Sequence, residues 1–163
     1  MSGTTLTMEQ IIPLIEAAPA RIAGFTDGLT EIQLHSVPTP GEWSANDVLA
    51  HLRSCADVWG NCIETIINQD HPTIRAVNPR TWIKSTDYLE QDFYPSLQAF
   101  TVQRAELLAV LKSLKPIVWS RTASVTGTGK VIVRSVHTYA ESIAVHERPH
   151  LKQIKRIADT MRT

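Results

Sequence analysis

Two histidines lie within the apolar stripe of the last helix that the sequence predicts. Apolar residues recur there at steps of three and four, the spacing that places side chains on one helix face turned toward a core. His146 and His150 occupy this face one turn apart. The stripe consists of Val136, Tyr139, Ile143, His146, His150, Ile154, Ile157 and Met161. Because a buried polar group without a partner is costly, both imidazoles need partners inside the fold.

His51 occupies the same kind of position in an earlier helix, whose stripe is Val48, His51, Cys55, Val58, Cys62 and Ile66. A single histidine on an apolar face is most often a core residue bonded to a backbone carbonyl. Residues spaced i and i+4 have Cβ atoms about 6 Å apart, so His146 and His150 can reach one cation. We therefore predict a divalent metal bound by His51, His146 and His150 inside a helix bundle.

Other residues are weaker candidates for this site. Asp47 and Cys55 share the face of His51 and could add a fourth ligand, but Asp47 also suits a first helical turn and Cys55 a core. The letters from His146 to His150 also spell H-E-x-x-H, a zinc protease signature. Such a protease needs a third ligand downstream, and Asp159 is the only acid or histidine that follows. Pro149 also removes a helical hydrogen bond, so we do not expect a metalloprotease.

Four main helices follow from the periodicity and the breakers. The first runs from about Met8 to Phe25 and is either one broken helix or two short ones, because Pro13 and Pro19 fall inside it. The others run from Ser44, in a capping-box pattern with Asp47, to about Asn68, from Pro95 to Leu114, and from Val131–Ser135 to about Met161. The strand-like run Val131–Val133 is interpreted as a helix start. An all-α four-helix bundle in a single domain, residues 1–163, is expected.

Composition narrows the classes of partner. The chain has 163 residues, 43% of them hydrophobic, with 16 basic and 16 acidic side chains. This balance gives no electrostatic reason to expect nucleic acid or an anionic membrane. The sequence shows no signal peptide or membrane-spanning segment, which favours a cytoplasmic protein. Cys55 and Cys62 would lie about 10 Å apart on one helix, too far for a disulfide, and are expected to be reduced.

Several short motifs together resemble the DinB/YfiT-like metalloenzyme family. They are Gly41–Ser44 leading into Val48–Leu52, Arg104–Leu108, Pro116–Trp119 and His146–Ile154. The resemblance extends from about Met8 to Ile157. It implies an up-down-down-up four-helix bundle, often a homodimer, with nickel, zinc or a similar ion on His51, His146 and His150. Some members of this family are thiol transferases or isomerases that use mycothiol, bacillithiol or glutathione, and many have no known reaction.

The chemistry of a three-histidine site leaves several functions open. A bound cation deprotonates a thiol or lowers the pKa of water, so a low-molecular-weight thiol S-transferase and a metal-dependent hydrolase of a small-molecule substrate are both consistent with it. A non-catalytic metal- or ligand-binding stress-response bundle is the third alternative. Arg104, on the stripe of the third helix, is expected to bind a carboxylate of thiol or substrate, unless it forms a buried structural ion pair. Trp43, Trp59 and Trp82 either line a pocket or pack in core and loops.

Overall fold

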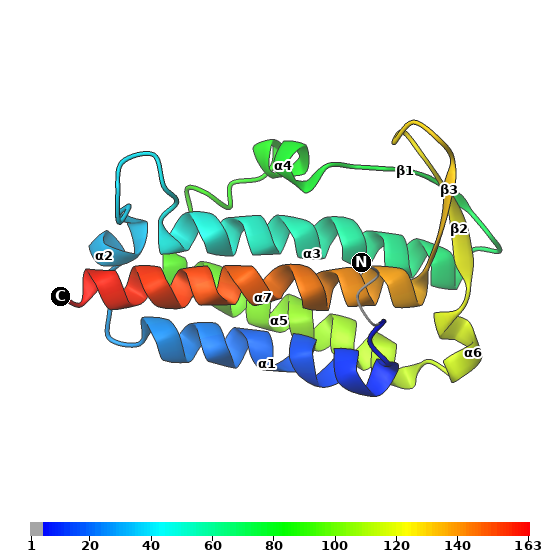
Figure 1. The fold of residues 1–163 in the computed structure, drawn as a ribbon, viewed down its shortest axis with the longest axis horizontal. Coiled ribbons are helices and arrows are strands. Elements are labelled where there is room, and N and C mark those ends of the chain that lie inside the picture. The colour runs from blue at the N-terminus through cyan, green and yellow to red at the C-terminus, as the bar shows by residue number, and fades with distance from the viewer. Residues whose placement is uncertain (1–4) are drawn as a thin grey trace.

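Four long helices form the body of the protein in a computed structural model that describes residues 5–163. They are α1 (Met8–Thr26), α3 (Ala45–Asn68), α5 (Phe93–Ser113) and α7 (Val136–Met161). Helix α7 packs against both α1 and α3, and α5 packs against the same two helices. In Figure 1 the colour gradient runs in one sense along α1 and α7 and in the opposite sense along α3 and α5. The predicted four-helix bundle is confirmed.

The helix starts agree with the capping residues in the sequence. Ser44 accepts a hydrogen bond from the Asp47 amide, and Asp47 accepts one from the Ser44 amide, so the predicted capping box begins α3. Ser135 caps α7 in a similar way through the Thr138 amide. Helix α1 continues through both of its prolines, so a single helix replaces the two sequence-based alternatives.

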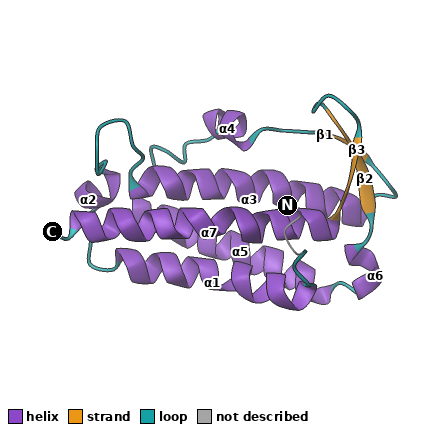
Figure 2. Ribbon diagram, in the orientation of Figure 1, coloured by secondary structure: helices purple, strands orange, loops and turns teal. Residues whose placement is uncertain are grey.

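A small sheet covers one end of the bundle, shown in orange in Figure 2. Its strands are β1 (Thr73–Arg75), β2 (Thr122–Thr126) and β3 (Ile132–Ser135), in the order β1-β2-β3. Strand β2 pairs parallel to β1 and antiparallel to β3. The interpretation of Val131–Val133 as a helix start is therefore wrong. Gly127 and Gly129 adopt positive φ angles of 88° and 94°, which turn the chain back so that β3 can pair with β2.

The segment between α3 and α5, here called the crossover (residues 69–92), runs along the outside of α3. It contains β1, α4 (Pro79–Trp82) and the 3-10 helix η1 (Ile83–Ser85). Side chains of α3 hold it in place: the Ser54 hydroxyl donates to the Pro79 carbonyl at 2.6 Å, and the Asp57 carboxylate accepts from Trp82 and Tyr88. The crossover thus lies fixed over the helix that carries His51. The remaining short helices are α2 (Glu31–His35) and α6 (Pro116–Trp119).

Two apolar clusters form the core, one toward each end of the bundle. The first gathers residues such as Ile22, Leu49, Phe93 and Ile154, and the second gathers Ile11, Ile63, Leu111 and Ile143. Midway along the helices, between these clusters, lie buried polar side chains that include His51, Arg104 and Glu147. This polar layer holds the residues that the sequence singled out.

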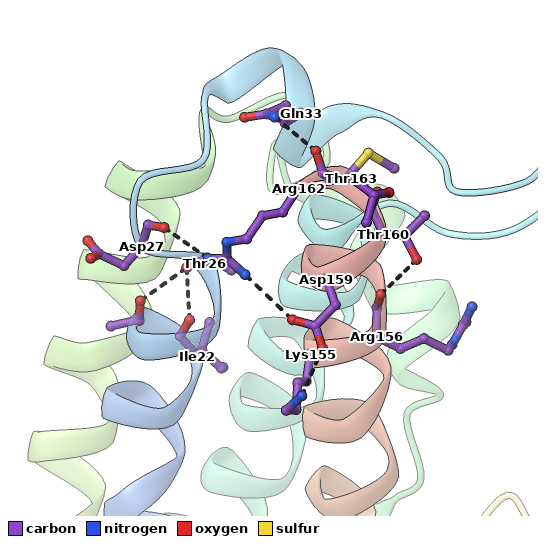
Figure 3. A network of polar contacts seen from close by, with 12 residues as sticks. Ile22, Thr26, Asp27, Gln33, Lys155, Arg156, Asp159, Thr160, Arg162 and Thr163 are labelled. Carbon is purple, nitrogen blue, oxygen red and sulfur yellow. Dashed lines mark hydrogen bonds and ion pairs between the residues drawn. The ribbon is translucent and has the colours of Figure 1, made fainter.

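Polar contacts fasten the end of α7 to the corner between α1 and α2 (Figure 3). Arg162 donates to the Asp27 carbonyl at 2.9 Å, and Gln33 donates to the Met161 carbonyl at 3.0 Å. Arg162 also lies 3.7 Å from Asp159. The Gln33 contact satisfies the carbonyl of Met161, the last residue of α7, and the Arg162 contact ties the end of this helix to the residue that follows α1.

Candidate metal centre

The Nε2 atoms of three histidines converge between α3 and α7. His51 Nε2 lies 3.2 Å from His146 Nε2, and His150 Nε2 lies 3.3 Å from the same atom. The i, i+4 spacing turns His146 and His150 to one face of α7, and the packing of α3 against α7 brings His51 to meet them. The structure therefore brings together all three residues that the sequence selected.

Hydrogen bonding does not account for this convergence. An imidazole Nε2 carries either one N–H or one lone pair, so His146 Nε2 cannot bond both neighbours at once. Two nitrogens that share a tetrahedral ion at 2.0–2.1 Å are about 3.3–3.4 Å apart. The two observed separations, 3.2 and 3.3 Å, are close to that value, so His146 can share a cation with His51 and can share one with His150.

The outer nitrogens of two of these rings differ in their surroundings. His150 Nδ1 lies 2.9 Å from Gln153 Oε1, a contact in which Nδ1–H donates and leaves the Nε2 lone pair directed at the cluster. His146 Nδ1 is buried without a hydrogen-bond partner among residues 5–163. Trp59 meets the His146 ring edge-on at 5.1 Å, and Trp43 stacks on His150 at 6.3 Å. Two of the three tryptophans considered from the sequence thus surround the imidazoles.

Burial lowers the pKa of both His51 and His146 to about 4, and the charge of His150 acts in the same direction. Both rings are therefore neutral at pH 7. Neutral imidazole is the form that binds metal ions, so no proton has to leave these two rings before a metal binds at that pH.

Cys55 is the best placed candidate for a fourth ligand. Its Sγ lies 3.6 Å from His51 Nε2, and the ligand atoms of Cys55, His51 and His146 are all within 4.8 Å of one another. Burial raises the pKa of the Cys55 thiol to about 12, so it is protonated until a cation draws the proton away. Asp47 is instead occupied at the start of α3, where it bonds the Ser44 amide at 2.9 Å.

Arg104 lies beside this cluster in a buried ion pair. Its guanidinium binds both oxygens of Glu147, with Nη1 3.0 Å from Oε2 and Nη2 bonded to Oε1. Nη1 also donates to the Ile15 carbonyl at 2.7 Å, a group left free because Pro19 has no N–H to offer it. The structure thus shows the buried ion pair that the sequence offered as the alternative role of Arg104. Binding of a substrate carboxylate by Arg104 stays a prediction.

Glu147 is the acid of the H-E-x-x-H pattern. Both of its oxygens are engaged by Arg104, so this carboxylate is not free to act as the general base of a protease. His137, the other histidine on α7, lies at the N-terminal end of this helix, where its Nε2–H donates to the Leu6 carbonyl at 2.7 Å. Trp82 lies in the crossover, 41% exposed, and bonds Asp57.

Two cavities open onto the histidines. The larger, about 750 Å³, lies between α3, α7 and the sheet, and we call it the sheet-side pocket. Its wall includes Trp59, Val77, Val125, Arg134, Tyr139 and His146. The smaller, about 310 Å³, is lined by His150, Trp43 and Arg80. A volume of 750 Å³ is ordinary for a small-molecule site, so the sheet-side pocket can hold a substrate beside His146.

The sequence profile of the DinB superfamily matches residues 14–154, which is most of the chain. The chain belongs to the DinB superfamily. Its structure is similar to YfiT from Bacillus subtilis, described as "a probable metal-dependent hydrolase with an unusual four-helix bundle topology". The TM-score is 0.80 at 20% sequence identity, over 99% of this chain and 93% of YfiT. This likeness shows the shared bundle fold.

None of the curated proteins compared with the chain matches it. Within residues 5–163, no helix combines the length and the apolar character that crossing a membrane requires.

Proposed function

We propose that this protein is a metal-dependent hydrolase of a small-molecule substrate, with the ion held by His51, His146 and His150. The observation that carries the proposal is the convergence of the three Nε2 atoms at 3.2 and 3.3 Å. Zinc or nickel suits three imidazoles at this spacing. The name given to YfiT is consistent with the proposal. When bound, such an ion polarises a carbonyl and lowers the pKa of water.

The residues around the cluster have separate tasks in this proposal. His150 is held in its tautomer by Gln153. Trp43 and Trp59 contact the rings of His150 and His146 and help to fix their orientation. The sheet-side pocket places the substrate next to His146. Cys55, 3.6 Å from His51 Nε2, is the group that would complete a fourth position in the resting protein.

Metal analysis of untagged protein tests the proposed site. We expect about one divalent ion per chain in the wild type and none in the His51→Ala variant, because two imidazoles on one helix are too few ligands for a stable site. His137→Ala is the matched control, since His137 lies on the same helix but bonds the Leu6 carbonyl, and it should retain the ion. Hydrolysis of 4-nitrophenyl esters should follow the metal content. Stoichiometric metal in His51→Ala would exclude this site.

Thiol transfer is the second candidate, and the neutral donor set favours it. Because an imidazole is neutral when it binds a metal ion, three histidine ligands would leave the charge of a divalent ion uncompensated, which favours an anionic ligand such as the thiolate of a low-molecular-weight thiol. The metal-loaded protein should then conjugate glutathione, bacillithiol or mycothiol with monochlorobimane faster than His51→Ala does. If the protein hydrolyses esters but conjugates none of the three thiols, thiol transfer is excluded and hydrolysis remains as the proposed function.

We also propose that the chain is one domain, acts in the cytoplasm and forms a homodimer. The family resemblance supports the dimer, and the two free cysteines, Cys55 and Cys62, suit a reducing compartment. The net charge of zero gives no support for a nucleic-acid partner. Sedimentation equilibrium at micromolar concentration should give twice the chain mass of 18.1 kDa. A clean 18.1 kDa species would contradict the dimer.

A further inference from the structure

Arg134 is distinctive among the arginines that are not exposed. Four arginines belong to this group: Arg53, Arg104, Arg121 and Arg134. The first three donate hydrogen bonds to a side chain or to backbone carbonyls. The Arg134 side chain forms no hydrogen bond and no ion pair with another residue within the described range, residues 5–163. A half-buried guanidinium without a polar partner has lost part of its hydration, and an anion placed beside it would restore a partner.

The strand that carries Arg134 has an inverted pattern of side chains. Side chains on a strand alternate between faces, so Ile132 and Arg134 share one face and Val131 and Val133 share the other. Ile132 packs against the core, whereas Val131 and Val133 are 63% and 64% exposed. The cation thus points inward and the valines point to solvent. Arg134 therefore lies on the inner face of β3, where its guanidinium can reach a group bound against the sheet.

Arg134 faces the sheet-side pocket at the end opposite His146. Its guanidinium carbon lies 5.8 Å from the centre of the Tyr139 ring, and both residues line the pocket. Tyr139 and His146 are seven residues apart on α7, which corresponds to about 10 Å along the helix. The wall between the two ends is mainly apolar, with Val58, Val125 and Val145.

The acid on the same pocket wall, Glu141, forms no ion pair with Arg134 within residues 5–163. Glu141 also lines the pocket, but its Oε1 accepts the Leu6 N–H at 2.8 Å and its Oε2 lies 3.9 Å from His137. Burial raises the pKa of Tyr139 and Cys62, and the positive charge of Arg134 opposes that change at both groups. The guanidinium therefore places a positive charge on the pocket wall that no salt bridge engages within residues 5–163.

We propose that the sheet-side pocket binds an elongated, largely apolar molecule with an anionic group at one end, and that Arg134 binds this group. The chemical class is a carboxylate or a similar anion on a chain about 10 Å long. The opposite, reacting end of the molecule then lies beside His146, and this part of the inference rests on the proposed function. Arg134 is a specificity residue, which holds the substrate and leaves the reaction to the histidine cluster.

Calorimetric titration of the metal-free full chain with octanoate and octanamide tests Arg134. Metal is removed by a chelator, because a carboxylate would also bind an ion at the histidines. We expect octanoate affinity to fall about tenfold or more in Arg134→Gln, and less in Arg134→Lys, which keeps the charge but loses the planar fork. Octanamide, which has no charge, should bind the wild type and Arg134→Gln equally. Arg75→Gln is the matched control, because Arg75 lies on β1 and lines a different cavity.

Several results would overturn the inference. They are an absence of octanoate binding to the wild type, an unchanged octanoate affinity in Arg134→Gln, an equal loss in Arg75→Gln, or an equal loss of octanamide affinity in Arg134→Gln. Metal analysis separates this inference from the proposed function. If the wild type binds no metal but octanoate binding depends on Arg134, the proposed function fails and the anion site stands. If the wild type carries metal and hydrolyses esters but the titrations fail, the anion site alone is excluded.

Discussion

His51 and His146 make the stability of the metal-free protein depend on pH. Burial lowers both pKa values from 6.5 to about 4, so the unfolded chain binds protons between these values that the folded chain does not. The contribution of these two histidines to the free energy of unfolding is therefore fully present above pH 6.5, and it is lost as the pH falls toward 4. For His51, which is 6% exposed, the loss is about 3 kcal/mol at pH 4.

Urea denaturation between pH 7 and pH 4 measures this loss. The His51→Ala variant should show a flatter pH dependence than the wild type, since it lacks one of the two imidazoles. Ser113→Ala is the control, because Ser113 is exposed at the end of α5 and carries no titratable group, so this variant should keep the wild-type slope. Equal slopes in all three proteins would show that His51 protonates as easily in the folded state as in the unfolded chain.

The ion pair of Arg104 and Glu147 predicts an asymmetric response to mutation. Arg104→Met should lower the free energy of unfolding by about 3–5 kcal/mol, because it leaves the buried Glu147 without its partner and the Ile15 carbonyl without a donor. The double variant Arg104→Met/Glu147→Leu removes both charges and should lose less. Urea denaturation at pH 7 compares them. A double variant as unstable as the sum of both single variants would contradict this account.

The sequence predicts which single residues belong to the site better than it predicts the partners that these residues contact. The stripes of two helices identify His51, His146 and His150, because each pattern needs only positions on its own helix. The partner of Arg104 is not predictable in this way, since Glu147 and Ile15 come from two other helices. Arg134 is not among the predicted site residues, because the sequence pattern of Val131–Ser135 indicates the start of a helix. The alternation of Ile132 and Arg134 with exposed valines was the available signal.

Among the secondary-structure elements, helix α7 carries a proline next to a proposed metal ligand. Pro149 cannot donate to the Val145 carbonyl, yet α7 runs without a break from Val136 to Met161. Replacing this residue with alanine restores one helical hydrogen bond. Pro149→Ala should therefore raise the free energy of unfolding by about 1–3 kcal/mol, and Pro149→Gly by about 1 kcal/mol less.

Thermal or urea denaturation of both Pro149 variants checks this prediction. Metal affinity, measured on the same proteins, shows whether the proline shapes the turn that contains His150. Because His146 and His150 already have their Nε2 atoms 3.3 Å apart, we expect the affinity of Pro149→Ala to stay close to that of the wild type. A loss of stability in Pro149→Ala would mean that the proline relieves a strain at this turn.

The long helices were predictable as elements and the sheet was not. Ser44 and Asp47 mark the start of α3, and periodic apolar residues extend each long helix to within a few residues of its observed end. Strands β1 and β3 have 3 and 4 residues, too short for periodicity to separate them from neighbouring helix or loop. Strand β1 (Thr73–Arg75) pairs with β2 (Thr122–Thr126), which is far from it in the chain, and local sequence patterns do not reveal such a pairing.

In the whole molecule, the candidate metal ligands and the buried ion pair lie at one level of the bundle. Apolar clusters occupy both ends, and the histidines, Arg104 and Glu147 lie between them. Such a layer lowers the apolar area available for the core, so its residues must be satisfied by one another or by a ligand. Arg104 and Glu147 satisfy one another. The three imidazoles have no equivalent arrangement among themselves, because His146 Nε2 faces two rings at once.

A metal at this level would join two helices that are far apart in sequence, since His51 belongs to α3 and the other two histidines to α7. The unfolded chain does not hold the three rings together, so binding to the folded state stabilises the entire bundle. At a free metal concentration of 100 times Kd, the gain is about 2.7 kcal/mol. For a chain of this size that corresponds to a rise in Tm of roughly 5–10 °C.

Calorimetric melting of metal-free protein with added zinc or nickel should show this rise in the wild type and in His137→Ala, and a chelator should reverse it. His51→Ala should melt at the same temperature with and without the ion. An equal rise in His51→Ala would mean that the stabilising ion binds elsewhere on the molecule and that metal binding at the three histidines does not cause the rise in Tm.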